Sequence, residues 1–324
     1  GSKLGILFKG GVAMDALKNI KAVVMDKTGT VTKGNFVVQK VRAGKGVTEQ
    51  ALLQICAGAE LASTHPIALS IVTEAQEQGL KLERPEKFEE IAGEGLVASY
   101  GEEVVLCGNA KLLERYGANI TDYHEAESGS EVLVVKNSKY LGQLVINDTL
   151  KEDAKVAITE LKKQGLVTVM LTGDSQREAE AIGKAIEIDE VRAKLLPQDK
   201  LQELNSLRDK YGSVMFVGDG INDAPVLAGA NVGAAMGSGA DAAIEAADVV
   251  FMNSEVASIN KAVAIAKVTS NIAWQNVIIA LGVKGIIMVA GLLGYASMWG
   301  AVFADTGVAM LCVLNSVRVL YKQF

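Results

Sequence analysis

Three short apolar runs along the chain end abruptly in polar loops that carry an aspartate. The runs cover residues 22–25, 167–171 and 213–217, and sequence with helical character follows each of them. Alternating strands and helices predict an α/β domain, a parallel sheet with helices on both faces. Because such sheets bind ligands beyond the carboxyl ends of their strands, we expect the three polar loops to converge on one crevice.

The sequence between the first and second of these strands has a separate pattern of short strands and helices. Residues 49–62 have helical periodicity, and residues 102–106 have the character of a strand. A stretch of about 110 residues is long enough for a domain of its own, so an inserted α+β lobe is predicted here. The predicted parts are a sheet domain that begins in residues 1–35 and resumes in 146–268, an inserted lobe at 36–145, and two helices at 269–324.

The last part of the chain is almost free of charged side chains. Between residues 277 and 314 only Lys284 and Asp305 are charged, and this stretch is long enough for two membrane-spanning helices of about 20 residues each. Basic residues flank it on both sides, which places both ends in the cytoplasm by the positive-inside tendency. A transmembrane helical hairpin is therefore predicted, with a buried hairpin of a large soluble domain as the alternative.

The composition agrees with a membrane protein that has large polar domains. Hydrophobic residues make up 49% of the 324 residues, and the mean hydropathy is +0.25. The formal net charge of -6 comes from charges of both signs mixed along the chain, which leaves no basic face for a nucleic-acid partner. Three cysteines without CxxC spacing indicate neither a disulfide framework nor a zinc knuckle, and we interpret them as small apolar fillers.

The loop after the first strand carries the string Asp26-Lys27-Thr28-Gly29-Thr30. A carboxylate at the end of a strand can act as a nucleophile toward a phosphoryl group and form an aspartyl phosphate. Later parts of the chain supply further groups for phosphoryl transfer, namely Thr172, Gly173, Asp174, Lys200, Asp219, Asn222 and Asp223. Hard oxygen ligands beside phosphate favour magnesium, which Asp26 and Asp219 would hold.

The string at Asp26 and the string Gly218-Asp219-Gly220-Ile221-Asn222-Asp223 resemble the phosphorylation and hinge signatures of P-type ATPases, which are haloacid-dehalogenase-like proteins. The resemblance implies that Asp26 and its neighbour Lys27 belong to a site phosphorylated from ATP, with Mg²⁺ at Asp26, Thr28 and Asp219. Many soluble phosphatases of this superfamily place a second aspartate where Thr28 stands. Without that acid and base an aspartyl phosphate is expected to persist, which suits a transport cycle.

The inserted lobe carries residues that resemble the nucleotide pocket of the heavy-metal subgroup of P-type ATPases. By this resemblance the ATP-binding residues are Glu60, His65, Gly93, Gly95, Gly108 and Asn109. Glycines let the backbone approach a nucleotide closely, and an imidazole can donate or accept a hydrogen bond. The alternatives are a simple Gly-x-Gly turn and a histidine that caps a helix beginning at Pro66.

Lys284 and Asp305 lie deep in the apolar stretch, where a charge is costly and usually pairs or lines an ion path. The zinc, cadmium and lead exporters of the family are similar here, with a lysine in the penultimate span and Asp-x-Gly in the last. The resemblance implies that Asp305 binds the transported ion and that Lys284 is its countercharge. A carboxylate suits zinc, whereas copper(I) favours softer ligands, and a mutual ion pair is the structural alternative.

Together these features predict ATP-driven export of divalent heavy-metal ions across the plasma membrane, with the catalytic domains in the cytoplasm. The family's first six membrane spans are absent from the sequence, so the chain is expected to need those spans as partners, along with the lipid bilayer. Three other functions compete with this hypothesis. Thr28 argues against a soluble phosphatase, Asp305 against a copper exporter, and the intact Asp26 against a non-enzymatic nucleotide-binding regulator.

Overall fold

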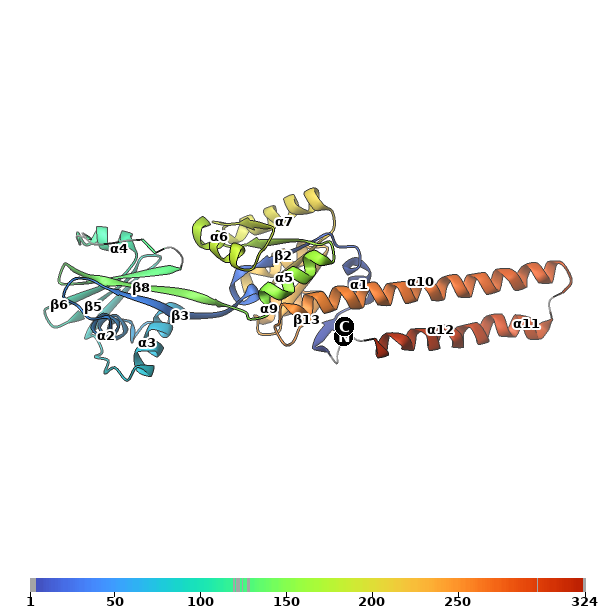
Figure 1. Ribbon diagram of the computed structural model, residues 1–324, viewed down its shortest axis with the longest axis horizontal. Coiled ribbons are helices and arrows are strands. Elements are labelled where there is room, and N and C mark those ends of the chain that lie inside the picture. The colour runs from blue at the N-terminus through green and yellow to red at the C-terminus, as the bar shows by residue number, and fades with distance from the viewer. Residues whose placement is uncertain are drawn as a thin grey trace. The chain divides into compact units, whose positions relative to one another are not determined.

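The computed structural model describes residues 4–118, 120, 123, 125–126, 129–295 and 297–322. The chain divides into two compact units, whose elements are labelled in Figure 1. The sheet unit consists of Gly1–Thr30, Glu152–Gly173 and Ile186–Phe324, and the inserted unit consists of Val31–Lys151 and Asp174–Ala185. Each unit has a sheet and a hydrophobic core of its own.

The sheet unit is built on a seven-stranded sheet that is parallel except at one edge. Its strands, in spatial order, are β1 (Ile6–Phe8), β13 (Val249–Phe251), β12 (Val232–Met236), β11 (Val214–Gly218), β2 (Ala22–Asp26), β9 (Val167–Leu171) and β10 (Glu190–Arg192). The strands β2, β11 and β12 are buried along their whole length, as expected for apolar strands with helices on both faces. The predicted parallel sheet is confirmed.

Helices cover this sheet and position residues at its edge. They are α1 (Gly11–Leu17), α5 (Ala154–Lys163), α7 (Pro197–Tyr211), α8 (Ala224–Gly229) and α9 (Asp241–Ala246). α7 begins with Pro197, and the Asp199 carboxylate accepts a hydrogen bond from Leu196 N at 3.0 Å, which closes the first turn. Lys200 lies in this first turn, so its backbone position is fixed by the start of the helix.

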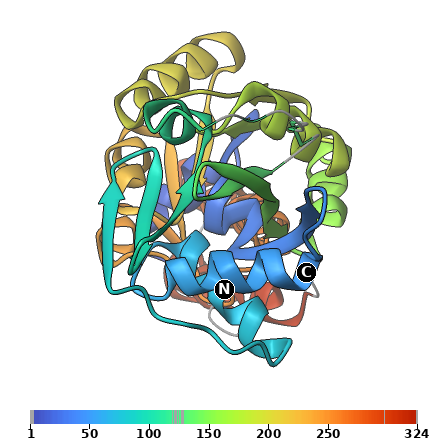
Figure 2. The same cartoon turned by 90° about the vertical axis from the view of Figure 1, so that its left-hand side faces the viewer.

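The inserted unit contains a six-stranded antiparallel sheet in the order β3 (Thr32–Ala43), β8 (Lys139–Leu150), β7 (Ser130–Lys136), β6 (Glu103–Gly108), β5 (Gly95–Tyr100) and β4 (Lys87–Ile91). Its helices are α2 (Glu49–Glu60), α3 (Pro66–Glu77), α4 (Ala110–Arg115) and α6 (Gln176–Ala185). α2 and α3 cover one face of the sheet and α4 covers the other (Figures 1 and 2). Residues of β6 alternate between the faces, so Cys107 packs under α2 while Leu106 packs under α4.

The inserted unit extends beyond the predicted lobe at 36–145 on both sides. The reason is that β3 and β8 pair along their length, from Thr32 with Leu150 to Ala43 with Gly142. The predicted helix at 49–62 corresponds to α2, which ends at Glu60, and the predicted strand at 102–106 corresponds to β6. Register between two distant strands is a tertiary property, so the sequence alone did not reveal these ends.

α10 (Ala257–Leu292) is one unbroken helix of the sheet unit, packed at its start and exposing apolar side chains farther along. Its first residue is held by Asp153, whose carboxylate accepts a hydrogen bond from Ala257 N at 2.8 Å. The Asn260 amide donates to Ala157 O at 2.9 Å, and Lys18 Nζ donates to Ser270 Oγ at 2.8 Å. These contacts tie the first part of α10 to α5 and α1.

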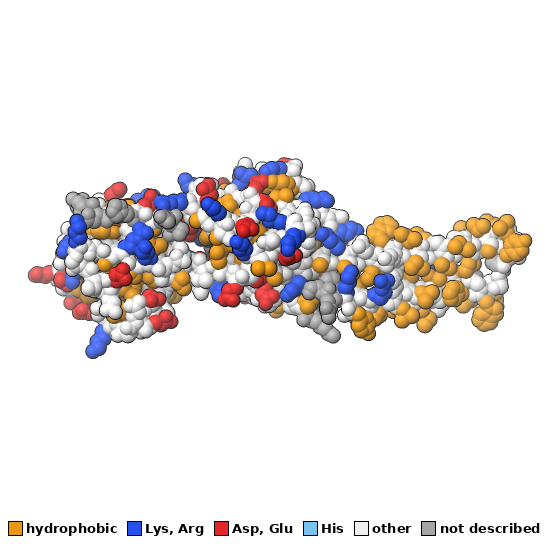
Figure 3. Space-filling model, viewed as in Figure 1, with side chains coloured by type: hydrophobic (Ala, Val, Ile, Leu, Met, Phe, Trp, Pro, Cys, Tyr) orange, Lys and Arg blue, Asp and Glu red, His pale blue; other side chains and the backbone are white. Residues whose placement is uncertain are grey.

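The chain returns beside α10 as α11 (Met298–Val302), a π turn at Phe303–Gly307 and α12 (Val308–Val317). The segments Ala257–Leu292 and Met298–Tyr321 are long and apolar enough to cross a membrane, and little of their apolar stretches is buried. Apolar side chains gather on the surface of these helices (Figure 3). The predicted apolar helical hairpin is confirmed.

Candidate functional site

β2 ends at Asp26, whose side chain lies beside a lysine and two further carboxylates. Lys200 Nζ is 2.6 Å from Asp26 Oδ1 and 2.9 Å from Asp223 Oδ1. One carboxylate oxygen from each of Asp26, Asp219 and Asp223 lies within 4.8 Å of the others. Asp219 and Asp223 follow β11, which pairs in parallel with β2, so two adjacent strands deliver all three acids to one edge. We call these four residues the carboxylate centre.

Three acids and one lysine make up the carboxylate centre, so its charges do not balance. Burial and then Asp223 raise the pKa of Asp26 to about 7, Asp219 adds to this, and Lys200 opposes it. Burial would lower the pKa of Lys200, but Asp26 and Asp223 raise it above its usual value. A cation among these oxygens would relieve the repulsion, and clustered carboxylates are the hard donors that magnesium binds. The residues present therefore fit Mg²⁺.

The turn after Asp26 passes directly against Asp219. Within this turn Gly29 has a φ of +70°, a left-handed conformation that glycine adopts without strain. A Cβ atom on Gly29 would lie 1.5 Å from Asp219 Oδ2. Glycine is therefore required at position 29 for two reasons, namely the left-handed backbone conformation and the close approach of the Asp219 carboxylate.

Other residues of the same two strings surround the centre without joining the cluster of acids. Lys27 is buried, whereas Thr28 and Asn222 are exposed. Asp223, which the sequence assigned to catalysis but not to magnesium, lies with the two predicted ligands Asp26 and Asp219. The roles of Thr28 as a magnesium ligand and of Asn222 in catalysis stay predictions.

The loop after β9 has a different setting. Thr172 is buried, its backbone N donates to Arg192 O at 3.0 Å, and its carbonyl accepts from Leu195 N at 3.1 Å. These bonds hold the chain as it leaves β10. Gly173 is the last residue of its segment of the sheet unit, and Asp174 belongs to the inserted unit. The parts played by these three predicted residues in phosphoryl transfer stay predictions.

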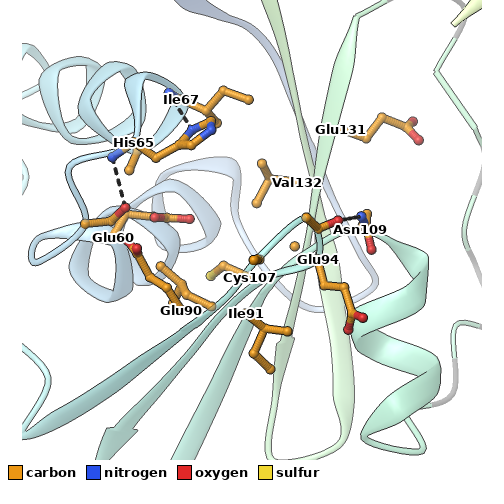
Figure 4. A pocket seen from close by; sticks show the side chains of 17 residues that line it. Glu60, His65, Ile67, Glu90, Ile91, Glu94, Cys107, Asn109, Glu131 and Val132 are labelled. Carbon is orange, nitrogen blue, oxygen red and sulfur yellow. Dashed lines mark hydrogen bonds between the residues drawn. The ribbon is translucent and has the colours of Figure 1, made fainter. Parts of the chain in front are cut away.

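A cavity of about 340 Å³ lies in the inserted unit, where the connection between α2 and α3 faces β5 and β6 (Figure 4). Its walls include all six residues predicted to bind nucleotide, namely Glu60, His65, Gly93, Gly95, Gly108 and Asn109. In Figure 4, Glu60 and His65 lie on one wall, Asn109 lies on the opposite wall, and Cys107 lies between them. The volume falls in the range of small-molecule sites, so this cavity is the candidate nucleotide site.

His65 both caps a helix and faces the cavity. It precedes Pro66, the first residue of α3, and its Nδ1 accepts a hydrogen bond from Ile67 N at 3.2 Å. A neutral imidazole that accepts at Nδ1 carries its proton at Nε2. The helix-cap alternative is thus correct, and it leaves the Nε2 hydrogen available as a donor to a ligand.

Asn109 shapes the opposite wall. Its Oδ1 accepts hydrogen bonds from Lys111 N at 3.0 Å and Leu112 N at 3.3 Å, which caps α4. Its Nδ2 donates to Gly93 O at 2.8 Å and so ties the Gly-x-Gly turn to that helix. Gly95, the second glycine of this turn, lies so close to β6 that a Cβ atom there would be 2.2 Å from Cys107 O. Asn109 and Gly95 therefore hold the shape of the cavity.

The cavity is acidic. Glu60, Glu90, Glu94 and Glu131 line it, and the described lining residues include no lysine or arginine. Glu60 is 7% exposed, and its burial, followed by the charge of Glu90, raises its pKa to about 8. Its carboxyl is therefore protonated at neutral pH and can donate a hydrogen bond. Such walls suit an uncharged base and ribose better than phosphate groups, which the carboxylates would repel.

Lys284 and Asp305 meet between the two apolar helices. Lys284 Nζ lies 3.0 Å from Asp305 Oδ1, which is the ion pair of the structural alternative, and the role of Asp305 as ligand of a transported ion stays a prediction. Asp305 lies in the π turn at Phe303–Gly307, and such turns inside helices are frequent at functional sites. The irregular turn in this helix therefore coincides with Asp305, the one acidic residue between positions 277 and 314.

The sequence matches a haloacid dehalogenase-like hydrolase family over residues 20–231, and a second family of that description over residues 200–263. The cadmium, zinc and cobalt-transporting ATPase of Bacillus subtilis is 46% identical, across 98% of this chain and 46% of that protein. The probable copper-exporting P-type ATPase of Archaeoglobus fulgidus is 39% identical, across 99% of this chain and 40% of that protein.

Among solved structures, a zinc-transporting PIB-type ATPase in its E2.Pi state superposes with a TM-score of 0.84. The two sequences are 37% identical, and the match covers 98% of this chain and 53% of that one. The chain thus spans about half the length of the proteins that it matches.

Proposed function

Since the chain belongs to the haloacid dehalogenase-like hydrolase family and is similar along nearly its whole length to heavy-metal-transporting P-type ATPases, we propose that it is the catalytic part of an ATP-driven exporter of divalent metal ions. The observation that carries this proposal is the carboxylate centre. It presents Asp26 beside Lys200 at the end of a buried parallel strand, with Asp219 and Asp223 in reach of the same cation.

At this centre Asp26 is the nucleophile. One of its oxygens bonds to the γ-phosphorus of ATP, the bond from that phosphorus to the bridging oxygen breaks, and ADP leaves. Lys200 offsets the charge of the two anions as they meet. Mg²⁺, when bound by Asp26, Asp219 and Asp223, supplies further charge neutralisation. Thr28 can neither protonate the leaving group nor activate water as an aspartate would, so the aspartyl phosphate persists.

The nucleoside end of ATP occupies the cavity of the inserted unit. The neutral Glu60 carboxyl and the His65 Nε2 hydrogen are two donors that ring nitrogens or ribose oxygens of ATP can accept from. The acidic walls keep the triphosphate out of the cavity. Base recognition and phosphoryl transfer are therefore tasks of different units.

The transported ion binds at Asp305, and Lys284 replaces it as countercharge after release. A carboxylate favours a divalent ion such as Zn²⁺ over copper(I). Identity to relatives separates these cargoes weakly, because the copper-exporting relative is 39% identical and the cadmium, zinc and cobalt transporter is 46% identical. The choice of zinc, cadmium or lead over copper therefore rests on Asp305. The two apolar helices lie in the plasma membrane, with the catalytic units in the cytoplasm.

The test compares two variants of the complete ATPase that contains this chain. Asp305→Ala is expected to abolish ATP hydrolysis stimulated by Zn²⁺, Cd²⁺ or Pb²⁺ and to leave nucleotide binding intact. Cys312→Ala, which removes the thiol of the apolar helices, is the matched control and should retain that stimulation. Hydrolysis stimulated by copper(I) alone, lost in Cys312→Ala and kept in Asp305→Ala, would contradict a divalent cargo.

A further inference from the structure

Two cysteines and a glutamate meet at the inner wall of the nucleotide cavity, where they share Glu60 with the candidate nucleotide site. We propose that Cys56, Glu60 and Cys107 bind a thiophilic divalent ion such as Zn²⁺ or Cd²⁺, and that an ion bound there excludes the nucleotide. The metal site stands on its own geometry. The exclusion of nucleotide rests on the proposed function of the cavity.

The three side chains have the spacing of a metal site. The two Sγ atoms and one Glu60 carboxylate oxygen all lie within 4.8 Å of one another. Two thiolates on one zinc ion are at most about 4.6 Å apart, twice a bond of about 2.3 Å, so small side-chain shifts complete the contact. Cys56 and Glu60 are one turn apart on α2, and Cys107 approaches them from β6. A helix and a strand packed together thus preorganise the donors.

The Glu60 side chain is largely buried, and it reaches the wall of the cavity. It is 7% exposed, and among the described residues its side chain makes no hydrogen bond. Both cysteines are fully buried in the core under α2. The Glu60 carboxyl is therefore available to bind an ion at the same wall as Cys107. A bound ion would satisfy the carboxylate and both sulfurs together.

Of the three side chains, Glu60 alone has exposed surface, and this surface faces the cavity. Glu60 and Cys107 line the cavity, as Figure 4 shows, whereas Cys56 lies behind them in the core. Zinc is commonly bound by three protein ligands, with water as the fourth ligand. Glu90 and Glu131 on the cavity wall, with no basic side chain among its described lining residues, raise the local concentration of cations.

Occupation of this site and of the nucleotide site is mutually exclusive because both use Glu60. A Glu60 carboxyl that is drawn onto an ion beside Cys56 and Cys107 cannot also contact a nucleotide in the cavity. The carboxylate centre offers oxygen donors only, from Asp26, Asp219 and Asp223. A thiophilic ion therefore binds the cluster with two cysteines in preference to the carboxylate centre.

The first test titrates Co²⁺ into the full chain in detergent and follows the thiolate-to-cobalt charge-transfer absorption. Carboxylate sites do not give this band. We expect it to saturate at one ion per chain and to be lost in Cys56→Ala and in Cys107→Ala. Cys312→Ala, the matched control, should keep it. Glu60→Gln should keep the band with affinity lower by at least about 10-fold. Absence of the band from the unaltered chain, or its survival in both Cys56→Ala and Cys107→Ala chains that melt cooperatively, overturns the site.

The second test measures competition with adenosine, because the phosphates of ATP bind divalent ions themselves. Zn²⁺ at about ten times its Kd should weaken adenosine binding to the unaltered chain about 10-fold, and should have no effect on Cys107→Ala. Equal adenosine affinity with and without Zn²⁺, while the cobalt band persists, overturns the exclusion. A chain that binds neither adenosine nor ATP in the absence of metal, yet shows the band, instead contradicts the proposed nucleotide role of the cavity.

Discussion

Replacement of Gly29 by alanine tests whether the turn after Asp26 holds Asp219 in place. The new Cβ atom would lie 1.5 Å from Asp219 Oδ2, far inside any van der Waals contact, so this carboxylate must move. A displacement of about 1 Å in a catalytic group lowers a rate about 100-fold, which corresponds to about 2.7 kcal/mol of activation free energy. We therefore expect phosphoenzyme formation in Gly29→Ala to fall by about two orders of magnitude.

Gly165→Ala in the sheet unit is the matched control. Gly165 also has a left-handed φ, of +78°, but a Cβ atom there would have nothing within 4 Å. Both variants incur the cost of an alanine at positive φ, about 1 kcal/mol, and only Gly29→Ala has the clash. The assay is the initial rate of acid-stable labelling from γ-labelled ATP, with thermal melting to monitor folding. Equal labelling rates in the two variants would refute the role assigned to this turn.

Two further predictions concern the nucleotide cavity. His65→Asn keeps a good helix cap but loses the Nε2 donor. The binding free energy of ATP should therefore weaken by about 1 kcal/mol in calorimetry, with little change in melting temperature. Unchanged affinity would remove His65 from the site. The pKa of Glu60 is raised to about 8, so ATP affinity should be constant near neutral pH and fall as pH rises through about 8 and the proton is lost. Glu60→Gln keeps a donor at every pH, and its affinity should not show this fall; a parallel fall in both proteins would assign it to another group.

The strands and loop motifs of the sheet could be predicted from the sequence, whereas the contacts between distant elements could not. The strands β2, β9 and β11 were found from sequence because a strand buried on both faces is a continuous apolar run that ends where polar loops begin. The resemblance to P-type ATPases was drawn from two loop motifs, and the heavy-metal subgroup from the inserted lobe and the apolar spans. Relatives that match 98% or more of the chain confirm both. Apolar runs and loop motifs are local in the sequence, so they can be recognised without knowledge of the tertiary structure.

Contacts that depend on how distant elements pack were not visible. Glu90 reaches the nucleotide cavity because β4 pairs with β5, and Cys107 meets Cys56 because alternation along β6 turns it toward α2. The cysteines were interpreted as apolar fillers because their spacing along the chain carries no metal signature. His65 was given two competing interpretations, and the structure shows that one ring nitrogen serves the helix while the other remains for a ligand.

Phosphorylation of Asp26 is the claim on which the account depends. The most direct test labels the complete ATPase containing this chain with γ-labelled ATP and Mg²⁺ in the presence of Zn²⁺ or Cd²⁺, and isolates the protein in acid. We predict one acid-stable, hydroxylamine-sensitive phosphate per chain that is absent from Asp26→Asn and present in Asp209→Asn, which alters an exposed aspartate on α7. Labelling of Asp26→Asn to the level of the unaltered protein would contradict the account.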